Sequence, residues 1–438
     1  RDFEKLSKHL EDYAPQKVSK ICGVSTEKIN EIARIYATAP AAIIFWGMGI
    51  SQHIHGTDNA RALISLSLMT GQIGRPGTGL HPLRGQNNVQ GASDSGLIPM
   101  VFPDYQRVDD SDANTFFENF WGTSLDKAPG LTVVEIMNEI AENKLKGLYV
   151  MGENPAMSDP DLNHARKALN SLQHLVVQDI FLTETAFYAD VILPASAFPE
   201  KTGTFTNTDR RVQLGRQAVD PPGEAKQDLW IIQQIANGVG LSWNYDGPED
   251  VFVEMTKCMP SIAGITWDRL EKDQSVTYPC TSKTDPGQPV IFTESFPTKD
   301  GLATFMPSTF SNADELPDDK FNFILITGRQ LEHWHTGAMT RRASMLDEIE
   351  PDPTASLCST DMKQLGITEG DLITVESRRG KIDVYARRDD SLQSNQIFIA
   401  FCFVESAANL LTNAALDPDA KIPEFKFCAV KVTNNSKH

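Results

Sequence analysis

The chain has 438 residues, and its composition, 40% hydrophobic and 22% charged, is that of an ordinary soluble globular protein. A chain of this length is expected to form about three domains. Its net charge of −18 argues against nucleic acid or an anionic membrane as a partner, and it contains no apolar stretch of the roughly 20 residues that a membrane-spanning helix needs.

The six cysteines indicate a reducing environment rather than a metal site. None of them forms a C-x-x-C pair, so we expect no zinc or iron–sulfur site within this chain. Free thiols are typical of a reducing compartment, which favours a cytoplasmic location. Because the chain starts at Arg1 without a methionine, we interpret it as part of a longer protein. The cysteines are Cys22, Cys258, Cys280, Cys358, Cys402 and Cys428.

The first 90 residues follow an α/β pattern. Residues 1–40 predict helices, and the apolar run Ala41–Trp46 predicts a buried strand that ends at the turn Gly47–Gly49. A further helix is predicted at Thr57–Met69. Strand, glycine turn and helix together form half of a parallel βαβ unit. The helix positions expected to face the core are Ala60, Leu63, Ile64, Leu66 and Leu68.

A polar stretch at residues 81–94 follows a glycine-rich turn at residues 74–79. It contains four side-chain amides, and Arg84 is the only cation between Arg75 and Arg107. A planar guanidinium in such a loop could hold a small carboxylate or a phosphate. The alternative is an ordinary solvated loop, because loops are generally polar.

Three more strands are predicted at Gly147–Met151, His174–Val177 and Asp190–Leu193, with helices at Asp159–Leu169 and around Thr183–Tyr188 between them. In an open parallel sheet, ligands bind outside the carboxyl ends of the strands. Polar side chains gather at those ends, and they predict a ligand site there, although some of them could instead cap helices. They are Gln52 after the first strand, then Glu153, Asn154, Gln178, Asp179, Glu200 and Thr204.

The remainder of the chain changes from α to β patterning. A helix is predicted at Asp228–Val239, residues 270–320 predict an irregular connection, and a domain boundary is expected near residue 315. Short strands around a single helix, Ser359–Leu365, then predict a small β-barrel. The predicted strands are Phe321–Thr327, Asp371–Ser377, Lys381–Ala386, Gln396–Phe401 and Phe425–Val432.

Several motifs together resemble the molybdopterin-dependent formate dehydrogenases. The resemblance covers nearly the whole chain and corresponds to the later part of that family's catalytic chain. Leu365–Asp371 resembles the double-psi barrel that closes these enzymes. The other motifs are Trp46–Ile50 with Gln52, Arg84-Gly85-Gln86-Asn87-Asn88-Val89-Gln90-Gly91-Ala92, Met151–Pro155, Val177–Phe181, Asp190–Pro194 and Lys426.

The resemblance implies parallel-sheet, Rossmann-like α/β domains followed by a C-terminal double-psi β-barrel. The expected divisions are 1–90 and 91–315, each α/β and cofactor-binding, and 316–438, the barrel that binds molybdopterin dinucleotide. The family's cofactor is molybdenum or tungsten held by two molybdopterin guanine dinucleotides. Its metal ligand, a cysteine or selenocysteine, and its 4Fe–4S cluster belong to a missing N-terminal part, so no metal ligand is expected in this chain.

The resemblance also implies roles for individual residues. Arg84 would hold the substrate, formate. Phe425 stands where the family often has tyrosine, so packing rather than a hydroxyl contact is expected there. His333 and His335 alternate as strand residues on one face do, but without a partner nearby they are not expected to bind a metal. The residues expected to bind the cofactor are Gly47, Gly49, Gln52, Gln86, Gly152, Glu153, Asn154, Gln178, Asp179, Asp228, Thr327, Arg329, His333, Trp334, Asn409, Phe425 and Lys426.

The expected reaction is the oxidation of formate to carbon dioxide, with electron-transfer subunits and the missing N-terminal part as partners. The chain by itself is expected to be inactive and to associate through exposed apolar surface. One alternative is another molybdopterin oxidoreductase, such as a nitrate or other oxyanion reductase. A second is a non-catalytic structural relative, as in respiratory complex I.

Overall fold

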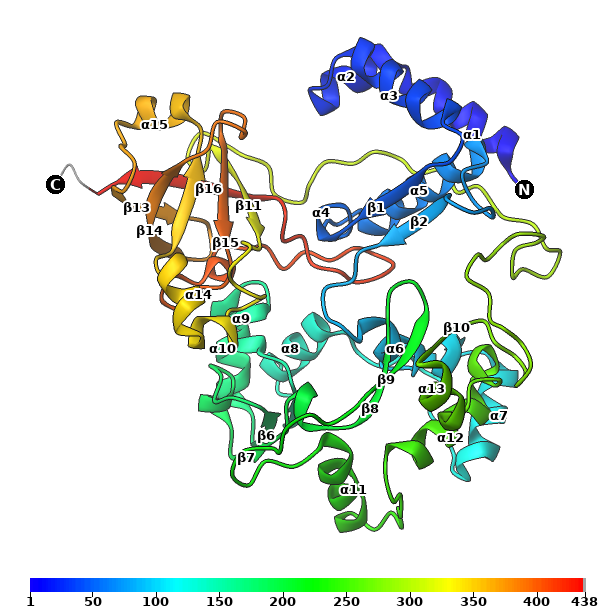
Figure 1. The fold of residues 1–438 in the computed structure, drawn as a ribbon. Coiled ribbons are helices and arrows are strands. Elements are labelled where there is room, and N and C mark those ends of the chain that lie inside the picture. The colour runs from blue at the N-terminus through cyan, green and yellow to red at the C-terminus, as the bar shows by residue number, and fades with distance from the viewer. Residues whose placement is uncertain (436–438) are drawn as a thin grey trace.

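The computed structural model describes residues 1–435, which form three parts (Figure 1). The N-terminal helices and a small sheet lie at one side, an α/β part lies below them, and a β-barrel formed by the C-terminal residues lies opposite the small sheet. Within residues 1–435, no helix is both long enough and apolar enough to cross a membrane.

The N-terminal part contains the helices and the strand that were predicted, and one strand that was not. The strands β1 and β2 pair in parallel, with Ile43 opposite Gly79. β2 lies where the sequence predicted a turn and a polar loop. The bounds are α1 Phe3–Leu10, α2 Pro15–Cys22, α3 Thr26–Thr38, β1 Ile43–Trp46, α4 Met48–Ser51, α5 Gly56–Thr70 and β2 Gly79–Pro82.

The inward face of α5 was predicted wrongly. Ile64 and Leu66 are 39% and 38% exposed, whereas Ser65 and Ser67 are buried. The hydroxyl of Ser67 forms a hydrogen bond of 2.9 Å with the hydroxyl of Tyr36 on α3. A paired hydroxyl can be buried at little cost, so apolar periodicity alone did not identify the buried face.

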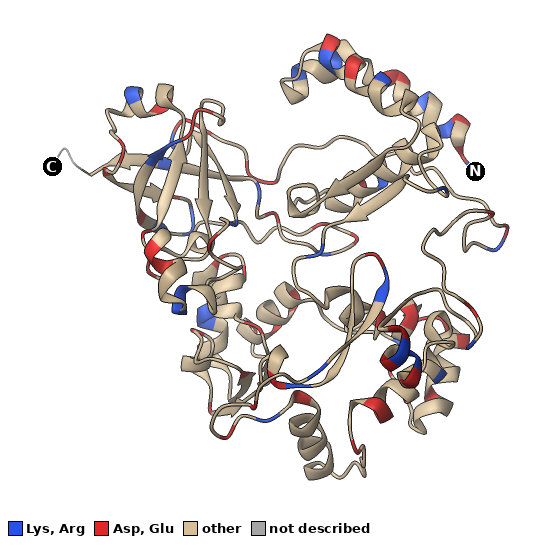
Figure 2. Cartoon of the chain, in the orientation of Figure 1, with Lys and Arg blue, Asp and Glu red and all other residues tan. Residues whose placement is uncertain are grey.

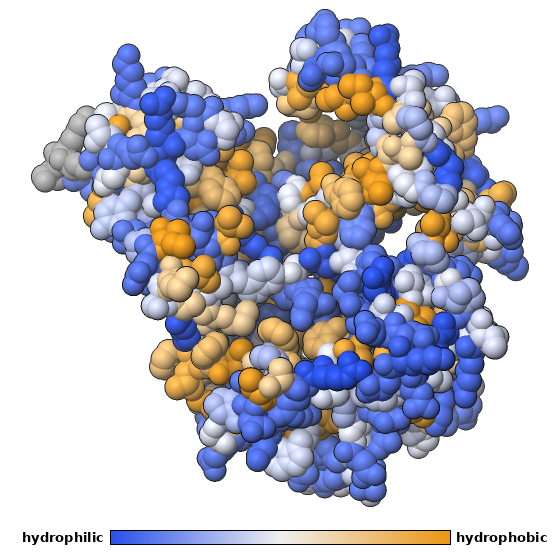
Figure 3. Space-filling view, in the orientation of Figure 1, coloured by the Kyte–Doolittle hydropathy of each residue, from blue (hydrophilic) through white to orange (hydrophobic). Residues whose placement is uncertain are grey.

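β1 was predicted to be buried, but Ile43 and Phe45 are 43% and 58% exposed. β1 has only β2 as a neighbour in its sheet. Figure 3 shows hydrophobic residues gathered over β1 and β2 and on the adjoining side of α3. Among the described residues, nothing covers this face of the sheet as a second layer would.

The three strands predicted in the α/β part are confirmed. They form a parallel sheet in the order β5-β6-β7, in which α10 connects β5 to β6. The helix predicted around Thr183–Tyr188 is only a short 3-10 turn at Ala186–Tyr188. The bounds are α8 Val133–Ala141, β5 Gly147–Met151, α9 Pro155–Ser158, α10 Leu162–Ser171, β6 His174–Asp179 and β7 Val191–Pro194.

A second layer beside this sheet contains an antiparallel sheet of order β10-β9-β8 and several helices. Its core includes Phe117, Ile265, Leu270 and Cys280, which are fully buried. α6 lies inside the polar stretch that was interpreted as a loop. Figure 2 shows acidic and basic residues interspersed over α12 and α13. The bounds are α6 Val89–Asp94, β3 Val101–Phe102, β4 Gln106–Arg107, α7 Ser111–Trp121, β8 Gly203–Thr206, β9 Arg211–Gly215, α11 Asp228–Gly238, α12 Pro248–Cys258, α13 Trp267–Asp273 and β10 Ser275–Thr277.

The predicted C-terminal barrel is confirmed as a closed barrel of six strands, in the order β11-β15-β12-β14-β13-β16. An irregular segment, residues 278–322, leads into it. Five strands were predicted, and β12 was missed. The bounds are β11 Phe323–Gly328, α14 Ser344–Ile349, β12 Thr354–Leu357, α15 Ser359–Leu365, β13 Leu372–Glu376, β14 Lys381–Arg388, β15 Gln396–Ala400 and β16 Cys428–Asn434.

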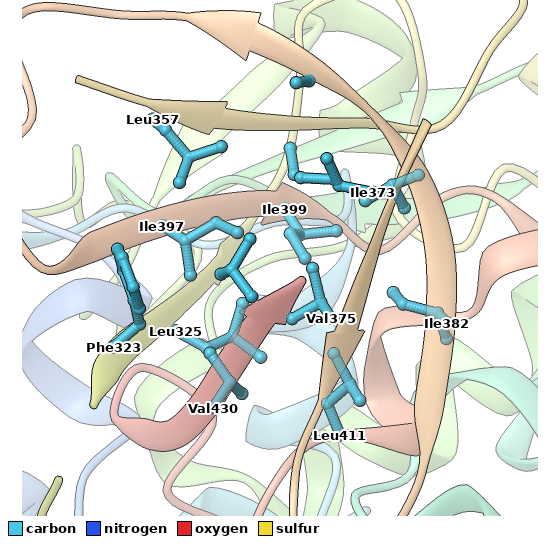
Figure 4. Close-up of a cluster of buried hydrophobic side chains, with 14 of the residues drawn as sticks. Phe323, Leu325, Leu357, Ile373, Val375, Ile382, Ile397, Ile399, Leu411 and Val430 are labelled. Atoms are coloured by element: carbon cyan, nitrogen blue, oxygen red, sulfur yellow. The ribbon is translucent and has the colours of Figure 1, made fainter. Parts of the chain in front are cut away.

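The barrel is filled by alternate side chains of its strands (Figure 4). Ile397 on β15 is fully buried among them. Ile397→Val would leave a cavity the size of one methylene group and should lower the free energy of unfolding by about 0.5–1.5 kcal/mol. Urea denaturation would measure this change. Ile324→Val, at a partly exposed position of β11, is the matched control, and an equal loss in both variants would contradict the tight packing seen around Ile397.

Candidate functional site

A cavity of about 270 Å³ lies at the carboxyl ends of the parallel sheet, where the sequence predicted a ligand site. Its second wall comes from the barrel, through the segment that follows β11. The residues from the sheet are Gly152, Glu153 and Asn154 after β5, Gln178 to Phe181 at and after β6, and Ala195 and Ser196 after β7; those from the barrel are Trp334, His335, Thr336, Ala338 and Met339.

A larger cavity of about 1020 Å³ adjoins the first. Arg84 and Gln90 line it, as do residues of the β8–β9 connection. The two cavities are neighbours, because seven residues line both of them. The shared residues are Gln86, Gly152, Ile180, Ser196, Lys201, Trp334 and Met339.

Arg84 is tethered at one edge of its guanidinium. Its Nη1 donates to the hydroxyl of Ser93 at 3.4 Å, while its Nε is buried and has no hydrogen-bond partner among the described residues. A buried donor without a partner is costly and indicates a place for a ligand. The next residue, Gly85, allows a close approach, because a Cβ at that position would lie 2.8 Å from Nη2 of Arg329.

The first cavity concentrates negative charge. Desolvation and the charge of Asp179 raise the pKa of Glu153, an exposed residue that lines the cavity. Burial also raises the pKa of Asp179, although the main-chain N–H groups of Ile180 and Phe181 oppose that effect. A ligand that presents N–H donors to these carboxylates would lower the cost of holding them together.

A third carboxyl, that of Asp159, is affected by the charge of Glu153. Asp159 is 5% exposed, and its Oδ2 has no hydrogen-bond partner among the described residues. Burial, followed by the charge of Glu153, raises the pKa of Asp159 to about 7. The neutral acid is therefore the favoured form below that pH. The contribution of Asp159 to stability is lost as the pH rises toward 7, since the folded-state pKa lies above the unfolded value.

The Asp159→Asn variant should therefore be as stable as the wild type at about pH 3, where Asp159 is protonated in both the folded and the unfolded protein. At pH 8 it should be more stable by on the order of 2 kcal/mol, because the wild type then buries an unpaired charge. Thermal unfolding of both proteins at the two pH values would measure this. A variant that loses stability at pH 8 would show that Asp159 has a partner in its charged form.

Gln178 and Asp228, both predicted to bind the cofactor, are part of one hydrogen-bonded chain. The hydroxyl of Tyr149 donates to the amide oxygen of Gln178, whose Nε2 donates to Asp228 at 2.6 Å. Lys201 forms an ion pair with Asp228. Sequence reasoning missed Lys201, which lines both cavities; its neighbour Glu200 was selected instead.

Two hydroxyls in the first cavity were also missed. The side-chain oxygens of Thr183 and Ser196 are buried without a hydrogen-bond partner among the described residues. Ser196 is the second residue after β7, and that position was the available signal. At Gly152, with a φ of 64°, a Cβ would meet nothing within 4 Å. Unpaired hydroxyls and open space at a backbone turn suit a phosphate or a ribose.

The barrel brings two cations close to His335, which lines the first cavity, although neither cation is itself part of a cavity wall. Arg329 stacks on the Trp334 ring, 4.3 Å from its centroid. The Nζ of Lys426 donates to the carbonyl of Thr327 at 2.6 Å, and burial lowers the pKa of Lys426 to about 8. Burial, with the charges of Arg329 and Lys426, lowers the pKa of His335 to about 4. An anion bound near His335 would be stabilised by the positive charges of Arg329 and Lys426.

Other predicted residues lie beside the cavities rather than in their walls. The turn Gly47–Gly49 and Gln52 follow β1, and the carbonyl of Gln52 accepts from the main-chain N–H of Lys426 at 3.4 Å, which places this turn beside the barrel. The hydroxyl of Thr327 donates to the carbonyl of Phe425 at 2.8 Å. These contacts bring the end of β1 and the barrel together.

Three predicted residues make contacts that organise the backbone. The amide oxygen of Asn154 accepts from the hydroxyl of Thr185 at 2.8 Å, so Asn154 shapes the turn after β6 as well as lining the cavity. A ring nitrogen of His333 is 2.7 Å from the carbonyl of Glu350. Asn409 is buried and donates to the carbonyls of Met157 and Ser158 at 3.0 and 3.1 Å, which joins the barrel to α9.

Comparisons with known proteins agree with the geometry. Residues 7–238 match the molybdopterin oxidoreductase family, and residues 323–429 match the molybdopterin dinucleotide binding domain. The chain is 49% identical to a formate dehydrogenase subunit alpha of Methanocaldococcus jannaschii over 98% of its own length, and 37% identical to formate dehydrogenase H of Escherichia coli, also over 98%. It spans 64% and 61% of those two proteins.

The structure of acetylene hydratase from Pelobacter acetylenicus has the same fold. It superposes with a TM-score of 0.73 over 99% of this chain and 66% of that one, at 19% sequence identity. The agreement extends to the α/β parts and the closed barrel, and at this level of identity it concerns the fold alone.

Proposed function

Because the chain belongs to the molybdopterin oxidoreductase family, we propose that it is part of the catalytic subunit of a formate dehydrogenase, which oxidises formate to carbon dioxide. The observation that carries the proposal is the Arg84 guanidinium, which lines the larger cavity with a buried, unpartnered Nε. Two parallel N–H donors of a guanidinium match the two oxygens of a carboxylate.

In this role Arg84 acts by orientation. Formate is an anion and carbon dioxide is neutral, so the attraction between Arg84 and the reacting group declines as the reaction proceeds. An interaction that weakens along the reaction cannot accelerate it by tighter binding of the transition state. Holding both oxygens instead fixes the direction of the C–H bond, and the loss of product charge favours release.

The polar side chains of the first cavity fit a molybdopterin guanine dinucleotide. The carboxylates of Glu153 and Asp179 can accept from the N–H groups of a guanine, and the unpaired hydroxyls of Thr183 and Ser196 can bind ribose or phosphate oxygens. Arg329 and Lys426 offer positive charge on the barrel side. When bound, the cofactor supplies a molybdenum or tungsten centre that accepts the electrons released by formate.

The remaining parts of the proposal concern the whole subunit. We infer electron-transfer subunits as partners, because relatives are named as alpha subunits of formate dehydrogenases. Two guanine dinucleotides and a 4Fe–4S cluster of the whole subunit belong to the same proposal, and they rest on the family resemblance. The division into 1–90, 91–315 and 316–438 belongs to the same proposal. Six free thiols support a reducing, cytoplasmic compartment.

The test uses the full-length protein, produced with molybdenum or tungsten in the medium, and a redox dye. Formate-dependent reduction of the dye supports the proposal. Oxidation of the reduced dye by nitrate, without formate activity, would identify an oxyanion reductase instead. Absence of both molybdenum and tungsten from the purified protein would point to a structural relative.

A further inference from the structure

A buried polar cluster lies on α6, next to the arginine assigned to formate. We call it the Asp94 cluster, and it consists of Gln90, Asp94 and Tyr278. Asp94 is 5% exposed. One of its carboxylate oxygens accepts from Nε2 of Gln90 at 2.7 Å, and the other accepts from the hydroxyl of Tyr278 at 2.7 Å. Nε2 of Gln90 also donates to the hydroxyl of Tyr278 at 3.0 Å.

The cluster connects directly to the larger cavity. Gln90 and Arg84 both line that cavity, and Arg84 donates to the hydroxyl of Ser93, the residue before Asp94. Arg84 and Asp94 do not form an ion pair within the described part of the chain, but the charge of Arg84 opposes the rise that burial causes in the pKa of Asp94. One side of the guanidinium therefore faces α6, while its Nε remains unpartnered among the described residues.

Tyr278 is suited to remain a hydrogen-bond donor. Burial, and then the negative charge of Asp94, raise the pKa of the Tyr278 hydroxyl. The phenol stays protonated and continues to donate to the carboxylate. The hydroxyl of Tyr105 accepts from Nε2 of Gln90 at 3.4 Å, and Tyr105 opposes the rise in the pKa of the Asp94 carboxyl. The carboxylate is thus held from several sides and has little freedom to turn away from Arg84.

We propose that Asp94 is a positioning residue, whose carboxylate keeps the Arg84 guanidinium in the orientation that meets both oxygens of formate. The inference rests on the proposed function. An arginine has a long, flexible side chain, and bidentate binding works only when its plane is aligned with the carboxylate. A fixed negative charge next in sequence to Ser93, whose hydroxyl accepts from the guanidinium, favours one orientation of the arginine before the substrate arrives.

The test is Asp94→Asn in the intact, cofactor-loaded enzyme. The amide keeps the shape of the side chain and can still accept from Tyr278, but it removes the charge. We expect kcat to fall about tenfold through misorientation. KM for formate should not rise, because removing a negative charge does not weaken the binding of an anion. A combined fall in melting temperature and cofactor content, with unchanged kcat per cofactor, would overturn the proposal in favour of a structural role.

A double-mutant cycle makes the test specific. In an Arg84→Ala background, Asp94→Asn should cause no further loss of kcat/KM, because the residue acts through the arginine. Additive losses would contradict this. Tyr278→Phe, which keeps the carboxylate and removes one donor, should lower kcat in the same direction by a smaller factor, and it carries the test if Asp94→Asn does not fold.

Ser95→Ala is the matched control. The hydroxyl of Ser95 donates within α6, to the carbonyl of Gly91 at 2.8 Å, so its loss disturbs the same helix without touching the cluster. Formate turnover should be unchanged in this variant, and a fall equal to that of Asp94→Asn would overturn the proposal. If the wild type itself does not oxidise formate, the proposed function fails; if only Asp94→Asn is without effect, this inference fails alone.

Discussion

Arg84→Ala should lower kcat/KM for formate about a hundredfold or more, a loss on the order of 3 kcal/mol. The variant removes the two charge-assisted hydrogen bonds that would hold the substrate carboxylate. Arg84→Lys should recover only part of the activity, because an ammonium is a point charge and cannot reproduce the planar fork. Steady-state kinetics with formate and a redox dye would measure both variants.

The cofactor content of the Arg84 variants shows whether a loss of formate turnover comes from lost substrate binding or from lost cofactor. Arg84 lines the larger cavity and not the smaller one, so both variants should retain metal and pterin at the level of the wild type. Full formate turnover in Arg84→Ala would refute the substrate assignment. Turnover that disappears together with the cofactor would move Arg84 from the substrate to a phosphate of the cofactor.

Asp179→Ala should reduce the cofactor content of the purified protein. The carboxylate lies in the smaller cavity at the end of β6, and one of its oxygens accepts from the main-chain N–H of Ile180 at 2.7 Å. Loss of a bidentate, charge-assisted contact with guanine would cost roughly 2–4 kcal/mol of binding free energy. Metal analysis and release of the guanine nucleotide from equal amounts of protein would measure it.

Asp190→Ala is the control for this change. Asp190 lies at the opposite end of the same sheet, where its carboxylate accepts from the main-chain N–H of Leu175 at 2.7 Å. It therefore shares the backbone contact of Asp179 without facing the cavity. Equal cofactor content in wild type and Asp179→Ala would assign Asp179 a capping role only. Equal losses in both variants would indicate damage to the sheet.

The strand ends that line the first cavity could be predicted from the sequence because short apolar runs there stop at polar residues. Val177 is buried in β6, and Gln178 and Asp179 follow it at the carboxyl edge. The parallel arrangement then brings these ends to one edge, as expected for α/β sheets. Local patterning was sufficient because each strand is complete within a few residues.

The features that could not be predicted from the sequence depend on contacts between residues far apart in the chain. β2 contains Gly79 and Pro82, residue types that are rare in strands, and it is a strand because it pairs with β1. The wall formed by Trp334 and its neighbours is brought to Asp179 only by packing of the barrel. Lys201 became a candidate only when the cavities that it lines were seen.

The strand that closes the barrel, β16, is also the last of the barrel strands to be synthesised, so the smaller cavity is completed late. β16, at Cys428–Asn434, pairs with both β11 and β13, and without it the barrel is open. The segment Trp334–Met339 that faces the parallel sheet is held by that barrel, so the smaller cavity has only one finished wall until β16 has left the ribosome. We therefore expect a cofactor to be bound only after β16 has been synthesised, because a nascent chain halted before residue 428 would carry the strand ends of β5 to β7 but no enclosed place for a dinucleotide.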